Sequence, residues 1–119
     1  MTVVPISKHA APEVVTEDSA ALEFVGRYDD MLRFDHSEGA WFRFDGATWR
    51  RDGTGAAHDW ARELVRKMAE AERNDATRAK LGRASFARGV EAFARNDQRI
   101  AVESNATLPY TVILPPVWP

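Results

Sequence analysis

Residues 32–51 alternate apolar with polar side chains, and from about residue 56 the apolar positions recur at the spacing of an α-helix. Asp45-Gly46 lies within the alternating stretch and favours a tight hairpin, because glycine adopts positive φ without steric cost. Residues 36–39 provide an earlier turn. We therefore predict a three-stranded antiparallel β-meander over residues 32–51, followed by helices.

The two faces of the predicted meander differ in composition. Segment 42–44 places its two phenylalanines on one side of the second strand, whereas Trp41 and Arg43 face the other side. We therefore predict that Trp41 and Arg43 lie on a contact surface. For Trp49 and Trp60 two interpretations stay open: packing between sheet and helix, or stacking on single-stranded bases beside neighbouring arginines.

The segments on either side of the meander have helical patterns. Thr16 is a typical N-cap followed by two acidic residues, which predicts a helix over residues 17–29. A helix of about eighteen residues is predicted from residue 56. A short helix over Thr77–Gly82 and a last one capped by Ser85 follow.

The spacing also predicts the buried faces of these helices. Leu22 and Val25 belong to the apolar face of the first helix, and Phe86 and Phe93 belong to that of the last. Gly89 has two interpretations: close approach of a neighbouring helix, or a helix weakened by about 1 kcal/mol.

These elements together predict one α+β domain over residues 16–102, with an N-terminal helix, a three-stranded antiparallel β-meander and two or three packed helices. Residues 1–15 are predicted to be a flexible arm, and residues 103–119 a proline-rich apolar tail. Residues 100–102 are predicted to form a short extended segment.

Several classes of chemistry lack the residues that they need. The chain has no cysteine, and its three histidines lie in an arm, a turn and a helix start, apart from one another. The turn at 52–55 lacks the Gly-Lys-Ser/Thr of a phosphate-binding loop. We predict no catalytic residues, no metal and no cofactor. The absence of a secretory signal and of an apolar span predicts a cytoplasmic protein without membrane contact.

Charge is distributed unevenly along the chain. Residues 1–61 hold 6 Lys/Arg against 11 Asp/Glu, whereas residues 62–99 hold 10 against 6. The basic half predicts a face that positions phosphates, unless it is simply a solvated helix surface. The candidate residues of this basic face are Arg78, Lys80, Arg83, Arg88 and Arg95.

The acidic half suggests a second binding surface, for a protein partner. Charge complementarity would let such a surface meet a basic partner. The candidate residues are Trp41 and Arg43 on the sheet, with the carboxylates Asp29, Asp30, Asp35 and Glu38.

Several motifs resemble one known family. They are residues 27–34 (RYDDMLRF), 41–50 (WFRFDGATWR), 52–55 (DGTG), 80–86 (KLGRASF) and 89–95 (GVEAFAR). The chain resembles, over about residues 18–102, the poxvirus-primase-type domain that lies between primase and helicase in phage and plasmid primase–helicases. The resemblance implies a linker or DNA-associated role without catalysis.

The resemblance also has an expected boundary. The family pattern continues past residues 100–102 with an acidic strand segment, whereas residues 103–119 do not resemble it. The 119 residues hold neither a primase nor a helicase pattern. We therefore expect a truncated, stand-alone form of the domain.

The resulting functional prediction is a non-enzymatic binding module of phage or mobile-element origin, associated with a nucleic-acid-processing complex. Its partner would be a protein of a replication or host-defence machine, with weak direct DNA contact as an additional possibility. The alternative is a stand-alone inhibitor of a host defence complex, of the anti-CRISPR type, that acts by protein binding. The homo-oligomeric state stays open.

Overall fold

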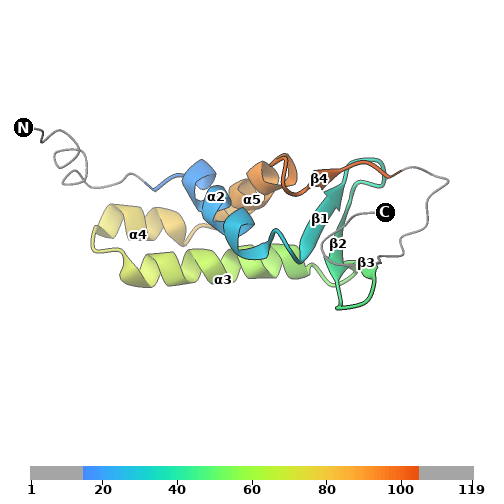
Figure 1. Cartoon of the computed structure of the whole chain (residues 1–119). Coiled ribbons are helices and arrows are strands. Elements are labelled where there is room, and N and C mark those ends of the chain that lie inside the picture. Colours follow the sequence, from blue (N-terminus) through green and yellow to red (C-terminus); the bar gives the residue numbers. More distant parts are fainter. Residues whose placement is uncertain (1–14, 105–119) are drawn as a thin grey trace, which may run out of the picture.

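The computed structural model describes residues 15–104, which form a group of helices with a small sheet at one end (Figure 1). The elements follow in the order α2 (Glu17–Tyr28), β1 (Leu32–Asp35), β2 (Ala40–Phe44), β3 (Trp49–Arg51), α3 (Ala56–Ala71), α4 (Asp75–Leu81), α5 (Ala84–Arg95) and β4 (Ala101–Val102). The predicted α+β class is confirmed. The arm and the tail fall outside the described residues, except for residues 15, 103 and 104.

Helix α2 begins where the sequence predicts it. The Thr16 hydroxyl accepts a hydrogen bond from the Ser19 backbone N–H at 3.0 Å, and the Thr16 N–H donates to the Ser19 Oγ at 2.9 Å. This reciprocal capping box stabilises the first turn. The predicted apolar face is partly wrong, because Leu22 is 54% exposed and Phe24 is fully buried in its place.

Within residues 15–104 the sheet has four strands in the order β3-β2-β1-β4, one more than predicted. The antiparallel meander of β1, β2 and β3 is confirmed. Strand β4 adds to β1 in parallel, through hydrogen bonds from the Phe34 N–H to the Ile100 carbonyl and from the His36 N–H to the Val102 carbonyl. The extended segment predicted at residues 100–102 thus makes the sheet mixed. Two residues of strand carry no detectable period, so the sequence did not indicate their partner.

The register of the first hairpin determines which side chains of the sheet point toward the helices. Phe34 lies opposite Trp41, and Arg33 lies opposite Phe42. Trp41 therefore shares a face with Phe34 and joins the main hydrophobic core, where it is only 7% exposed. The prediction that Trp41 lies on a contact surface is wrong, because its face packs against helices.

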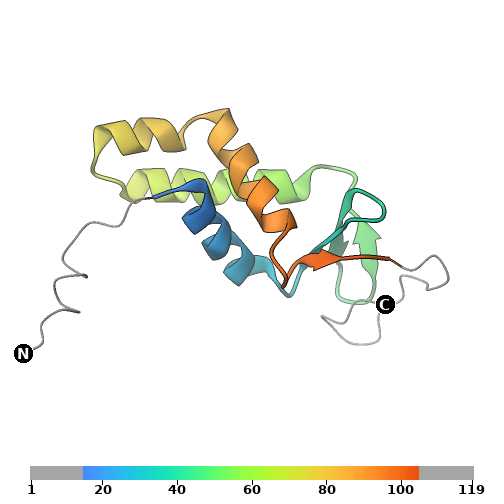
Figure 2. The same ribbon diagram turned by 90° about the horizontal axis from the view of Figure 1, so that it is seen from above.

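Helix α5 crosses over α3 and runs beside α2 (Figure 2). A Cβ atom placed on Gly89 would lie 2.7 Å from the Glu17 Cγ and 3.3 Å from its Cβ. This contact favours the first interpretation of Gly89, close approach of a neighbouring helix. Phe93 is exposed on α5, contrary to prediction, while Val90 and Ala94 are fully buried.

The starts of the last two helices differ from prediction. Helix α4 begins at Asp75, because the Asn74 side chain caps it by accepting from the Thr77 N–H at 2.9 Å. Helix α5 begins at Ala84 and has Arg83 at its N-cap position without a side-chain capping bond. Ser85 therefore lies inside the first turn of α5 and is not its cap.

The turn that precedes α3 also caps that helix. Gly55 occupies the N-cap position with φ 74°, a left-handed conformation that favours glycine. The Asp52 carboxylate accepts hydrogen bonds from the Ala56 and Ala57 N–H groups, both at 3.1 Å. Burial raises the pKa of Asp52, but the hydrogen bonds from Ala57, Ala56 and Thr54 outweigh it and hold the pKa below its ordinary value.

We expect Asp52→Ala to lower the free energy of unfolding by about 1–2 kcal/mol at neutral pH, as loss of a helix cap does. A carboxyl whose pKa is depressed by folding stabilises above its unfolded pKa of about 4, and this contribution disappears as pH falls through the folded pKa. The difference between wild type and variant should therefore shrink in acid, as measured by urea unfolding from pH 7 downwards. Glu63→Ala, an exposed substitution on α3, is the control; a pH-independent difference would contradict the capping role.

Candidate functional site

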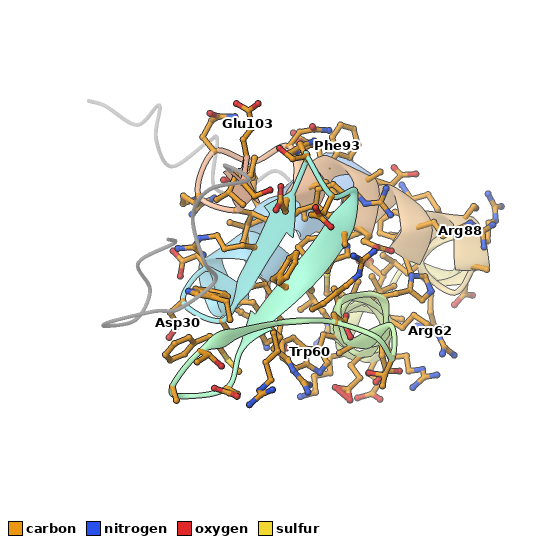
Figure 3. The ribbon with its side chains drawn as sticks, turned by 90° about the vertical axis from the view of Figure 1, so that its right-hand side faces the viewer. Asp30, Trp60, Arg62, Arg88, Phe93 and Glu103 are labelled. Atoms are coloured by element: carbon orange, nitrogen blue, oxygen red, sulfur yellow. The ribbon has the colours of Figure 1, made fainter. Side chains whose placement is uncertain are left out.

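A hollow of about 620 Å³ lies where the end of β2 faces α3. We call it the aromatic hollow; its lining residues are Asp30, Met31, Arg43, Phe44, Asp45, Gly46 and Trp60. Asp30 and Trp60 both lie near the lower end of the strands in Figure 3. Segments that are far apart in the chain, the α2–β1 turn and the first turns of α3, thus meet at one place.

The Trp60 ring in the wall of this hollow is held by one aromatic and one cationic neighbour. The Trp60 ring stacks on Tyr28, with ring centroids 4.9 Å apart and 30° between the planes. The Arg43 guanidinium lies 5.8 Å from the centroid of the Trp60 ring. A cation over an indole face is stabilising, so Arg43 and Tyr28 hold the ring in a defined orientation.

The acidic side of the hollow contains a carboxylate that hydrogen bonds hold in place. Hydrogen bonds from the Thr48 N–H, the Arg50 guanidinium and the Ala47 N–H hold the pKa of Asp45 well below its usual range. Gly46 follows with φ 98°, as the predicted Asp-Gly hairpin requires. Asp45 is therefore a fixed negative charge beside the exposed carboxylate of Asp30 and the half-exposed side chain of Met31.

A second recess, of about 170 Å³, lies between α3 and the junction of α4 with α5. We call it the basic groove; its lining residues are Arg62, Val65, Arg66, Leu81, Gly82, Arg83, Ala84 and Ala87. Three arginines from two parts of the chain therefore line one small recess.

A buried carboxylate connects the helices with the sheet. Glu91 of α5 is 8% exposed and accepts a hydrogen bond from the Trp41 indole N–H at 2.7 Å. The other carboxylate oxygen lies 3.0 Å from the His58 Nδ1, and Arg95 donates to the carboxylate at 3.2 Å. This Glu91 cluster ties β2, α3 and α5 together. The sequence reasoning missed it, because its members are far apart in the chain.

The comparison with protein families gives one match. The family model described as D5 N terminal like matches residues 21–111. The chain belongs to this family. It is the family of primase–helicase N-terminal domains, so the chain is a primase–helicase-related module. No curated protein and no solved structure matches the chain.

The family match corrects one expectation about this D5 N-terminal-like domain. The resemblance was predicted to end near residue 102, whereas the matched region continues to residue 111. The family pattern therefore extends into the segment that was predicted to depart from it.

Three residues of the predicted basic face have partners within the D5 N-terminal-like domain. Arg78 donates to the Glu72 carbonyl and pairs with Asp75, and the Lys80 ammonium donates to the Val15 carbonyl at 2.8 Å. Arg95 belongs to the Glu91 cluster and lies over the Phe34 ring. Each of these three cations therefore has a partner within the fold, while the Arg78 and Arg95 side chains remain about half exposed.

Arg83 and Arg88 are exposed and form no ion pair within residues 15–104. Arg83 lines the basic groove, and Arg88 is exposed on α5. Arg62 and Arg66, which the prediction omitted, line the groove from α3. Their spacing of four residues on one helix face was the signal that could have identified them.

The predicted acidic surface is also divided. Asp35 is fully buried, where its Oδ1 accepts from the Ser37 N–H at 2.9 Å and from the Ser104 N–H at 3.0 Å. It therefore stabilises a turn and the chain after β4, and its assignment to an exposed surface is wrong. Glu38 is exposed and pairs with Arg51 at 3.3 Å. Asp29 lies at the end of α2, and its carbonyl accepts from Arg33.

The structure brings together two of the predicted partner-binding residues, Asp30 and Arg43, in the aromatic hollow. Within residues 15–104, no group of three or more histidine and acidic side chains is arranged as a metal site. In the same range, no helix has the length and apolar character needed to cross a membrane.

Proposed function

We propose that this D5 N-terminal-like domain is a non-enzymatic binding module of phage or mobile-element origin that associates with a replication-type nucleic-acid complex. The observation that carries the proposal is the aromatic hollow, where Arg43, Trp60 and Asp30 meet on a member of a primase–helicase family. The partner that we propose for it is a protein of that complex.

The composition of the hollow suits a protein partner. Tryptophan, arginine and methionine are enriched at the centres of protein interfaces, and Met31 is 37% exposed at this place. An apolar or aromatic side chain of the partner would pack against Trp60 and Met31. A basic group beside it would meet the carboxylates of Asp30 and Asp45, which gives the contact its orientation.

Site-specific photocrosslinking tests this proposal. A photoreactive amino acid replaces Met31 in the 119-residue chain, which is expressed in cells that carry the replication proteins of the source element. We expect the crosslinked partner to be a primase or helicase protein. Arg43→Glu should reduce the crosslink at least about tenfold, because it removes the cation that orients the Trp60 ring, and the new carboxylate repels those of Asp30 and Asp45 and so disturbs the wall of the hollow.

Arg73→Glu is the matched control, because Arg73 is exposed between α3 and α4 and does not line the hollow. A crosslink that Arg43→Glu and Arg73→Glu reduce equally would contradict the role of the hollow. Crosslinks to a host-defence complex alone would instead favour the inhibitor alternative. Nucleotide hydrolysis by the purified chain would contradict the non-enzymatic assignment.

A further inference from the structure

The basic groove contains cations that the fold does not neutralise. Neither Arg66 nor Arg83 forms an ion pair with another residue of the 15–104 range. Arg62 reaches only Asp59, at 4.0 Å, and both of these side chains are about half exposed. Pairs at such distances on an exposed surface contribute little. Three guanidinium groups therefore line one recess with almost no compensating negative charge, which an anionic ligand would supply.

The apolar walls of the groove strengthen its attraction for an anion. Val65, Leu81 and Ala87 are buried and form apolar walls beside the arginines. A charge beside apolar atoms is less screened by water than one on an open surface, so an anion gains more there. Helix α5 also begins at the groove, without a side-chain cap or an acidic residue in its first turn. Its partial positive charge adds to that of the arginines.

The shape of the site points to phosphate groups in a chain. A volume of about 170 Å³ accommodates a phosphate with its oxygens, and arginine binds phosphate through two parallel hydrogen bonds. Arg62 and Arg66 lie one helical turn apart, about 6 Å along α3, so they can contact neighbouring phosphates. Arg88 continues the positive charge, and Figure 3 shows it on the same side of the molecule as Arg62.

We infer that the basic groove binds the phosphodiester backbone of single-stranded nucleic acid. A flexible single strand can follow a recess between helices, whereas duplex DNA is read by elements that project into its grooves. The contacts would position the strand without reading its sequence. This inference deepens the proposed function, on which it rests, by naming the nucleic acid that the module contacts in its complex.

The test is fluorescence anisotropy of a labelled oligothymidine titrated with the 119-residue chain. We expect Arg66→Glu/Arg83→Glu to weaken binding about a hundredfold, since each charge-assisted contact is worth about tenfold or more. The slope of log affinity against log salt should become shallower by about 1.4, since about 0.7 is lost for each phosphate contact on a single strand.

The matched control is Lys67→Glu/Arg73→Glu, which makes the same change in net charge at exposed positions outside the groove. It should change the affinity less than about threefold, because neither side chain lines the groove and salt partly screens both charges. An equal loss in both double variants would overturn the inference. Arg66→Gln/Arg83→Gln, with circular dichroism and thermal unfolding of every variant, separates loss of binding from loss of folding.

Competitors at matched ionic strength identify the ligand. Oligothymidine should compete better than duplex DNA, polyglutamate or the same concentration of phosphate groups as inorganic phosphate. Equal competition by any of the three would overturn the assignment to a single strand. Arg43→Glu should leave oligonucleotide binding unchanged, and the groove variants should leave the crosslink from position 31 unchanged. The failure of one proposal is therefore distinguishable from the failure of the other.

Discussion

Replacement of Glu91 by alanine should lower the free energy of unfolding by about 3 kcal/mol, because it removes one acceptor that serves three donors. The Trp41 indole N–H and the Arg95 guanidinium lose their partner, and His58 loses the carboxylate beside its Nδ1. The tryptophan is buried, so water cannot fully replace the lost hydrogen bond. This effect exceeds that expected for a surface substitution.

Urea unfolding followed by circular dichroism measures this effect. Glu91→Gln should recover part of the loss, because an amide oxygen still accepts from the Trp41 indole but carries no charge for Arg95. Glu70→Ala on the exposed face of α3 is the control and should stay within about 0.5 kcal/mol of wild type. A double-mutant cycle of Glu91→Ala with Trp41→Phe should show coupling of about 1 kcal/mol. Additive effects would mean that the two residues do not depend on each other.

Replacement of Asp35 by alanine should lower the free energy of unfolding by about 2–3 kcal/mol. One buried carboxylate oxygen of Asp35 accepts from backbone N–H groups of the turn after β1 and of residue 104. Its removal leaves those N–H groups without their acceptor and weakens the attachment of the chain that follows β4.

Hydrogen exchange distinguishes this role from a general loss of stability. The amides of Ser37 and Ser104 should exchange faster in Asp35→Ala than global unfolding explains, because they open locally. Glu38→Ala, in the same turn but exposed, should leave both amides protected as in wild type. Loss of protection in Glu38→Ala, or unchanged protection in Asp35→Ala, would contradict the assignment of Asp35 to the turn.

Local signals in the sequence predicted most of the secondary structure. Thr16, the Asp45-Gly46 hairpin and the change of period near residue 56 each act through neighbours in the chain, and the structure confirms all three. For strand β4 the extended segment was predicted but its pairing with β1 was not, because this pairing connects residues that are 67 positions apart in the chain. No local pattern specifies such a partner.

The candidate sites were predicted less well, for a related reason. Of the predicted basic residues, Arg83 lies in the basic groove, while Lys80 and Arg95 are bound to other parts of the fold. A cation that pairs within the fold and one that stays free look the same in a sequence. Only packing shows which carboxylates and carbonyls lie within reach.

The sequence by itself determined the alternation of residues along β1 and β2, and therefore which side chains of each strand share a face. It did not determine the pairing register, and therefore not which side chains of neighbouring strands lie on the same side of the sheet. The register sets Phe34 opposite Trp41, and a shift by one residue would have turned the phenylalanines of β2 toward the helices instead. The observed register turns Trp41 toward the helices, where it is buried beside Glu91. Only the assembled fold decides this, because apolar surface is buried when sheet and helices pack together.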